Sequence, residues 1–166
     1  MKYLWSPWRM PYIQSKKSDE ECVFCSELSR IDGEGNLIIY RGLSNFLILN
    51  RYPYTSGHLM IVPNTHVSTL EQLDEETSNE MMKLAKKTLL VLDAVYHPQG
   101  YNMGINIGQA AGAGITEHVH MHIVPRWVGD TNFMSALNQT RVLPETLEET
   151  YGRISKAWRN HLTQSP

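Results

Sequence analysis

The chain has 166 residues, 42% of them hydrophobic and 19% charged, a composition that predicts one soluble globular domain over 1–166. Its formal net charge of −2 excludes a broad electrostatic attraction to nucleic acid polymers. No apolar run is long enough to span a bilayer and the first residues lack a signal-peptide core, so we expect a cytoplasmic protein without a membrane partner.

An aromatic arm opens the chain over residues 1–20. It carries Trp5 and Trp8, whose large apolar surfaces favour burial. We therefore expect the arm to pack against the domain or against a second subunit.

Cys22 and Cys25 form a CxxC pair directly after this arm. In a cytosolic chain this spacing indicates a redox pair or half of a metal site, and two structural thiols are a third interpretation. The redox interpretation requires a βαβ context, which the neighbouring sequence lacks. A metal site is therefore favoured, and it needs two further ligands.

Apolar patterning predicts five strands and two main helices. The expected strands cover 37–40, 45–50, 58–63, 101–108 and 117–124. We expect the first helix over 68–97 with Asp74 as its N-cap, and a final helix over 145–163 that begins after Pro144. Hairpin strands with helices set apart from them predict an α+β fold.

Three histidines alternate along the fifth expected strand. On a strand, His118, His120 and His122 line one face, and the apolar residues between them enter the core. Single strand histidines are commonly structural, but three on one face repel when charged and need partners when buried. The pattern favours catalysis, with a metal site as the alternative, and the two can coexist.

A run of small residues, 108–114, lies just upstream of the histidines. Its glycines permit a close backbone approach and allow N–H groups to point at an anion. The histidines beside this loop indicate a phosphate site with an imidazole nucleophile.

These residues resemble the histidine-triad (HIT) superfamily of nucleotide hydrolases and transferases. The resemblance covers about residues 3–135 and includes its bacterial branch, which is related to diadenosine tetraphosphate hydrolases and phosphorylases. It rests on the triad 118–124, on the Asn50…Gly57-His58 element and on the Pro125-Arg126-Trp127 tail. It implies an antiparallel sheet of about five strands with two helices, and a homodimer that joins two sheets into one.

The resemblance also implies site roles. The residues that would act in catalysis are His120 as the nucleophile on the α-phosphorus, His122 as the phosphate contact and proton donor to the leaving group, His118, and His58 as a brace. The residues that would bind substrate are Asn50 at the ribose, Asn106 and the Ala113, Gly114 and Ile115 backbone at phosphate oxygens, and Trp127. The nucleophile's other ring nitrogen would need a hydrogen-bond acceptor, for which a backbone carbonyl is expected.

Zinc-containing members of the superfamily pair a CxxC with two histidines. By this resemblance Cys22, Cys25, His66 and His118 would form a closed structural Cys₂His₂ zinc site. The site would tie the N-terminal segment to the catalytic strand.

The implied function is cleavage of the α-phosphate linkage of (di)nucleoside polyphosphates or nucleoside phosphoramidates. Triphosphate-type hydrolases carry glutamine four residues before the first triad histidine, where this chain has Gly114. The second nucleophile could therefore be either water or inorganic phosphate, and the sequence leaves both alternatives open. A nucleotide-binding module without catalysis is a further alternative.

Overall fold

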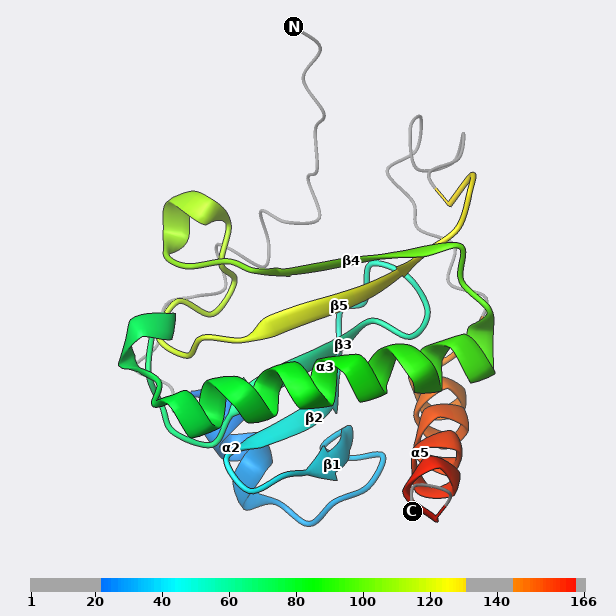
Figure 1. Ribbon diagram of the computed structural model, residues 1–166, viewed down its shortest axis with the longest axis horizontal. Coiled ribbons are helices and arrows are strands. Elements are labelled where there is room, and N and C mark those ends of the chain that lie inside the picture. Colours follow the sequence, from blue (N-terminus) through cyan, green and yellow to red (C-terminus); the bar gives the residue numbers. More distant parts are fainter. Residues whose placement is uncertain (1–21, 131–144, 164–166) are drawn as a thin grey trace, which may run out of the picture.

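The computed structural model describes residues 22–130 and 145–163. Within them one antiparallel five-stranded sheet has the order β1-β2-β3-β5-β4 (Figure 1). The strands are β1 (Ile38–Arg41), β2 (Asn45–Leu49), β3 (Leu59–Pro63), β4 (Gly100–Ile105) and β5 (Met121–Arg126). The sheet and its helices confirm the predicted α+β fold.

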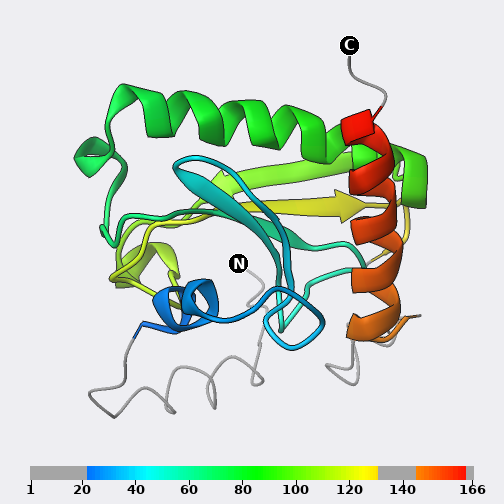
Figure 2. The ribbon, with the colours of Figure 1, turned by 90° about the horizontal axis from the view of Figure 1, so that it is seen from below.

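The described helices lie on two sides of the sheet (Figure 2). The long α3 (Glu75–Tyr96) follows a short 3₁₀ turn, η1 (Leu70–Gln72), and covers one face; α5 (Leu147–Thr163) packs against α3 and β1. Asp74 caps α3 as predicted, because its Oδ1 accepts the Thr77 N–H at 2.7 Å. The expected start of this helix, residue 68, was too early by seven positions because the cap lies at Asp74.

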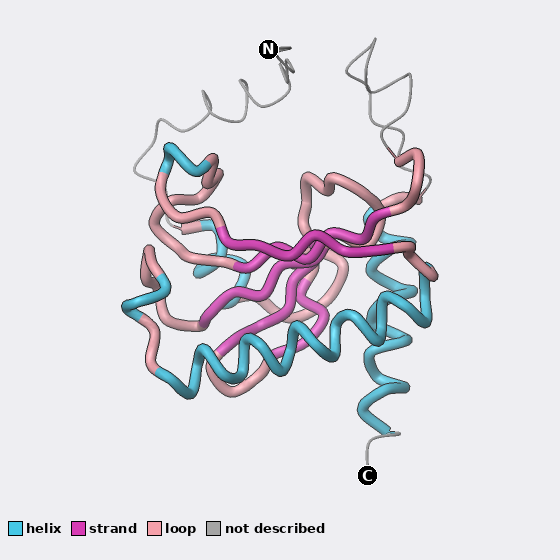
Figure 3. The backbone as a smooth tube through the Cα atoms, turned by 45° about the horizontal axis from the view of Figure 1, so that its top comes forward, coloured by secondary structure: helices cyan, strands magenta, loops and turns pink. Residues whose placement is uncertain are grey.

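A third helix was not predicted. The seven-residue α2 (Val23–Ser29) carries Cys25 and begins directly after Cys22, on the side of the sheet opposite α3 (Figures 2 and 3). Two turns are too short to show a hydrophobic period, so the sequence offered no helical signal there.

The strand register decides which side chains face away from α3. Tyr101 of β4 donates its hydroxyl to Asp93 of α3 at 2.7 Å, so Tyr101 faces that helix. Since alternate residues face opposite sides, Gly104 faces away from α3 together with its paired residue His122. Met60 of β3 also pairs with His122 and joins this second face.

The fifth strand begins later than the sequence suggested. It starts at Met121, so His118 and His120 precede the strand and have no pairing partner in the sheet. Continuing the β3–β5 register would place Val119 opposite Pro63, which has no N–H to donate. The Val119 N–H donates instead to the Val67 carbonyl at 2.7 Å. The prediction of a strand from 117 was wrong for this reason.

Two predictions fall outside the described residues: the arm over 1–20 and the position of Pro144. Within 22–130 and 145–163, the helices are too short or too polar to cross a membrane. The buried apolar side chains of the described sheet and helices form one cluster, which includes Leu47, Ile61, Leu92 and Trp158.

Candidate active site and metal centre

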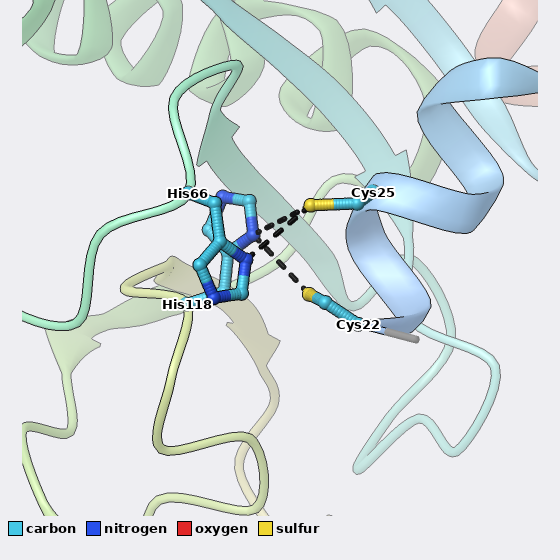
Figure 4. A group of neighbouring side chains, drawn as sticks. All are labelled: Cys22, Cys25, His66 and His118. Atoms are coloured by element: carbon cyan, nitrogen blue, oxygen red, sulfur yellow. Dashed lines mark hydrogen bonds between the residues drawn. The ribbon is translucent and has the colours of Figure 1, made fainter. Parts of the chain in front are cut away.

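Four potential metal ligands converge from three separate segments. Cys22 and Cys25 lie at α2, His66 follows β3, and His118 precedes β5. Their ligand atoms all lie within 4.8 Å of one another. Figure 4 shows both thiols pointing toward the two imidazole rings.

The distances in this cluster match a tetrahedral metal site. The Cys22 Sγ–His118 Nδ1 and Cys25 Sγ–His66 Nδ1 distances are both 3.3 Å, and Cys25 Sγ–His118 Nδ1 is 3.7 Å. Zinc–sulfur bonds of about 2.3 Å and zinc–nitrogen bonds of about 2.0 Å place such atoms about 3.5 Å apart in a tetrahedron. Two thiolates and two imidazoles are a common zinc donor set. The residues present therefore fit zinc.

The His118 ring is prepared to act as a ligand. Its Nε2–H donates to the Pro63 carbonyl at 2.8 Å, so the lone pair lies on Nδ1, which faces the sulfurs. Burial lowers the pKa of His118 below its ordinary value, which favours the neutral ring. Metal binding requires this neutral form.

His120 has the opposite arrangement of ring nitrogens. Its Nδ1–H donates to the His118 carbonyl at 2.8 Å, so Nε2 carries the lone pair in the neutral ring. This contact is the backbone acceptor that the sequence led us to expect. The His120 ring is buried, and its centroid lies 4.8 Å from that of His122.

A chain of hydrogen bonds sets the protonation of His122. The Tyr54 backbone N–H donates to His58 Nδ1 at 3.1 Å, so in the neutral His58 ring the proton lies on Nε2. This Nε2–H donates to His122 Nδ1 at 3.0 Å. The neutral His122 ring therefore carries its own proton on Nε2.

The environment keeps His122 neutral. Burial, with a smaller contribution from the neighbouring His120, lowers the pKa of His122 to about 4. At neutral pH the ring thus offers one N–H donor and no second proton. The Nε2 lone pair of the neutral His120 ring and the Nε2–H of His122 thus belong to two neighbouring rings whose centroids lie 4.8 Å apart.

The residues expected to bind substrate lie in several segments around His120 and His122. Asn50 contacts His58, with its Nδ2 3.3 Å from Nδ1. Continuing the β4–β5 register by one residue places Asn106 opposite His120. Ala113, Gly114 and Ile115 are half-buried in the loop between η2 (Gln109–Ala111) and His118. Trp127 directly follows β5 and donates its backbone N–H to Asp130 at 3.3 Å. Their contacts with a substrate stay predictions.

A cavity of about 250 Å³ lies away from these histidines, between loop 51–57 and the start of α5. Its lining includes Leu49, Arg51 and Leu147 but none of the triad residues. The chemistry of the site is therefore defined by the histidine cluster and not by this cavity.

Two aromatic residues at the site were missed. The Tyr54 ring stacks on His58 with centroids 4.9 Å apart, and Phe24 of α2 contacts His120. A tyrosine close to Gly57-His58 was a weak signal. Phe24 had none, because its α2 helix was not predicted.

Comparisons with known proteins agree with this geometry. Residues 34–128 match the family described as HIT domain. The chain is 36% identical over 165 residues to the AP-4-A phosphorylase of Mycobacterium tuberculosis, covering 95% of this chain and 85% of that protein. A Zn-bound histidine triad family protein from Mycobacterium smegmatis superposes with a TM-score of 0.70 at 29% identity, covering 87% of this chain and 98% of that one.

A more distant structure supports the fold alone. The Plasmodium falciparum diadenosine triphosphate hydrolase, solved in complex with cyclomarin A, has a TM-score of 0.64 at 17% identity and covers 93% of this chain and 95% of that one. The family match spans most of the chain and includes His58, His118, His120 and His122. This chain belongs to the HIT domain family.

Proposed function

We propose that the protein transfers a nucleotidyl group from (di)nucleoside polyphosphates or nucleoside phosphoramidates through a covalent bond to His120. The observation that supports this proposal most directly is the hydrogen bond from His120 Nδ1–H to the His118 carbonyl. It leaves the lone pair on Nε2 available for attack. Nε2 forms a bond to the α-phosphorus while the bond from phosphorus to the leaving group breaks with its electron pair. The charge that the ring acquires is shared with the same carbonyl through Nδ1–H.

His122 contributes as a hydrogen-bond donor in this proposal. Its Nε2–H would contact a phosphate oxygen, where charge develops as the leaving group departs. With a pKa of about 4 the His122 ring is neutral at pH 7. We therefore propose that it donates a hydrogen bond to the leaving group, in place of the full proton transfer that the resemblance implied. His122 is half-buried whereas His118 and His120 are buried, so we place the phosphate approach on the His122 side.

We propose that Cys22, Cys25, His66 and His118 hold a structural zinc ion. The donor distances and the Zn-bound relative from Mycobacterium smegmatis support this assignment. Four protein ligands close the coordination shell, so the ion supplies stability and no reacting water. His118 thereby joins the two sites, since its ring faces the sulfurs and its carbonyl holds His120.

The acceptor in the second step is water or inorganic phosphate. In either case an acceptor oxygen forms a bond to phosphorus, the bond to His120 breaks, and the ring recovers its lone pair. When the acceptor is water, the proton that it loses passes to bulk solvent. The relative named AP-4-A phosphorylase favours phosphate as a second candidate acceptor. The absence of a side chain at Gly114 leaves room for either acceptor.

A substrate panel tests this function. Diadenosine tetraphosphate and adenosine phosphoramidate, whose leaving groups are not nucleoside diphosphates, are incubated with and without phosphate, and the products are identified by mass. Hydrolysis yields a nucleoside monophosphate in both conditions, whereas phosphorolysis yields a nucleoside diphosphate only when phosphate is present. Binding of nucleotide with no product in either condition would support the non-catalytic alternative.

The His120→Ala variant assigns the nucleophile. We expect turnover to fall by about 10⁴-fold or more while nucleotide binding and zinc content are retained. Turnover equal to that of the unchanged protein would remove His120 from this role.

We also propose a homodimer formed along β4. This strand is one of the two edge strands of the described sheet, and Asn102, Met103 and Gly104 on it are exposed. Pairing two such edges would join two sheets into one. Sedimentation should give twice the 19.0 kDa chain mass.

A location in the cytoplasm stays our prediction, and two thiol ligands are consistent with a reducing compartment.

A further inference from the structure

Phe24 contacts both the proposed nucleophile, His120, and the metal cluster, which is formed by Cys22, Cys25, His66 and His118. It lies on α2 between Cys22 and Cys25 and is 3% exposed. Its ring centroid is 4.9 Å from that of His120, with an interplanar angle of 58°. The same ring meets His118 edge-on, with centroids 5.5 Å apart and an angle of 81°. One side chain thus touches both a ligand and the nucleophile.

This contact restricts a motion that the hydrogen bond to His120 allows. The bond from Nδ1–H to the His118 carbonyl fixes one atom of the ring, and the imidazole can still pivot about that point. An aromatic ring packed on the imidazole blocks the pivot because close-packed rings leave no free volume. A nucleophile must be held in near-attack geometry, and a displacement of about 1 Å costs about 100-fold in rate.

We propose that Phe24 is a positioning residue that holds the His120 imidazole in its attacking orientation. The inference rests on the proposed function, in which His120 is the nucleophile. Phe24 does not contact the substrate in this account. It acts only by limiting where Nε2 of His120 points.

The position of Phe24 depends in turn on the metal cluster. The α2 helix has seven residues, no side-chain hydrogen bond at its N-cap, and no acidic residue in its first turn or basic residue in its last turn. Helices of this length are not stable on their own propensity. The last turn of α2 is held by Arg41, which donates to the Leu28 carbonyl at 2.7 Å, and by Asn36, which donates to the Glu27 carbonyl at 3.2 Å. At the other end of α2, the contacts with His118 and His120 come from Cys22, Cys25 and buried Phe24.

The main test is Phe24→Leu, which keeps an apolar side chain but removes the ring. We expect kcat to fall by about 10- to 100-fold with KM changed by less than about 2-fold, because orientation is lost and substrate contacts are not. Zinc content should stay at the level of the unchanged protein. A kcat within about 2-fold, or a rise in KM alone, would overturn the proposal.

Leu84→Ala is the matched control. Leu84 is 6% exposed on α3, across the sheet from α2, so its truncation destabilises the protein without touching the site. We expect a lower Tm with unchanged kcat. An equal loss of kcat in this variant would mean that Phe24→Leu acts through general destabilisation, and the proposal would fail.

A structural measurement reports on the contact without activity. Nuclear Overhauser effects between the Phe24 and His120 ring protons should be present in the zinc-loaded protein and lost after the metal is removed by chelation. Their persistence in the metal-free protein would overturn the dependence on the cluster.

The nucleophile is tested separately. If the unchanged enzyme forms a nucleotidyl-His120 adduct and Phe24→Leu keeps full kcat, only the positioning role fails. If the unchanged enzyme forms no such adduct, the proposed function itself fails.

Discussion

Two histidine clusters meet at His118. The imidazole rings in them carry their protons on opposite nitrogens. In the metal cluster, the His118 ring donates from Nε2 and presents Nδ1 to the sulfurs. In the second cluster, formed by His58, His120 and His122 and called here the transfer cluster, His120 donates from Nδ1 and keeps its lone pair on Nε2. One backbone carbonyl near each ring makes the difference, Pro63 for the first and His118 for the second.

The comparison teaches that partners, and not residue type, assign function here. His122 receives a third arrangement, because His58 donates to its Nδ1 and leaves the proton on Nε2. The proposed ligand, the proposed nucleophile and the proposed hydrogen-bond donor are thus alternate residues of one short segment. Each assignment can be broken by changing one partner.

Removing the metal ligands should produce the largest change in stability. The double variant Cys22→Ser, Cys25→Ser should lose its zinc and about 10 °C of Tm, because the ion joins three separate segments. Its turnover should fall less than that of His120→Ala, since the nucleophile is still present. Zinc analysis and thermal unfolding measure both effects.

Val23→Ala is the control for that variant, because Val23 is 45% exposed on α2 and offers no ligand atom. It should keep zinc and Tm. Full zinc content in the double cysteine variant would overturn the ligand assignment.

Replacing His58 should break the transfer cluster and leave the metal cluster intact. His58→Leu removes the donor to His122, and we expect a loss of kcat of about 100-fold with zinc content unchanged. His58→Gln carries an amide N–H near the position of Nε2 and should recover most of the activity. Equal losses in both variants would show that the donor at this position has no role.

The acid stability should report on His122. Its folded pKa of about 4 lies below the ordinary value of 6.5, so the unfolded chain takes up the proton first as the pH falls. The contribution is complete above pH 6.5 and is lost progressively down to about pH 4. The free energy of unfolding should therefore depend less on pH in His122→Gln, by about 1.4 kcal/mol per pH unit in this window. Equal slopes in both proteins would contradict the assigned pKa.

The smallest effect is expected in α5, which packs against α3 and β1. Gly152 is exposed in α5, and an added Cβ would meet no atom within 4 Å. Gly152→Ala should stabilise the protein by about 1 kcal/mol, which corresponds to a Tm increase of about 3 °C, with kcat unchanged. A lower Tm would show that the glycine is needed for another reason.

The sequence predicted the sheet and the residue types of both clusters, because alternating apolar residues and the Cys and His spacings are local signals. It misplaced the start of the fifth strand, since the missing N–H of Pro63 acts only through pairing with a distant segment. It could not show the tautomers, which depend on carbonyls and N–H groups brought close by the fold. Phe24 was missed because its contact with His120 spans almost a hundred positions of the chain.

The most direct test of the account is to trap the covalent intermediate. A single turnover is stopped in alkali, where a phosphorus–nitrogen bond to histidine survives, and the digested protein is analysed by mass spectrometry. We expect one added nucleoside monophosphate on the peptide that contains His120, assigned to that residue and absent from His120→Ala. An adduct on another residue, or turnover without any adduct, would contradict the central claim.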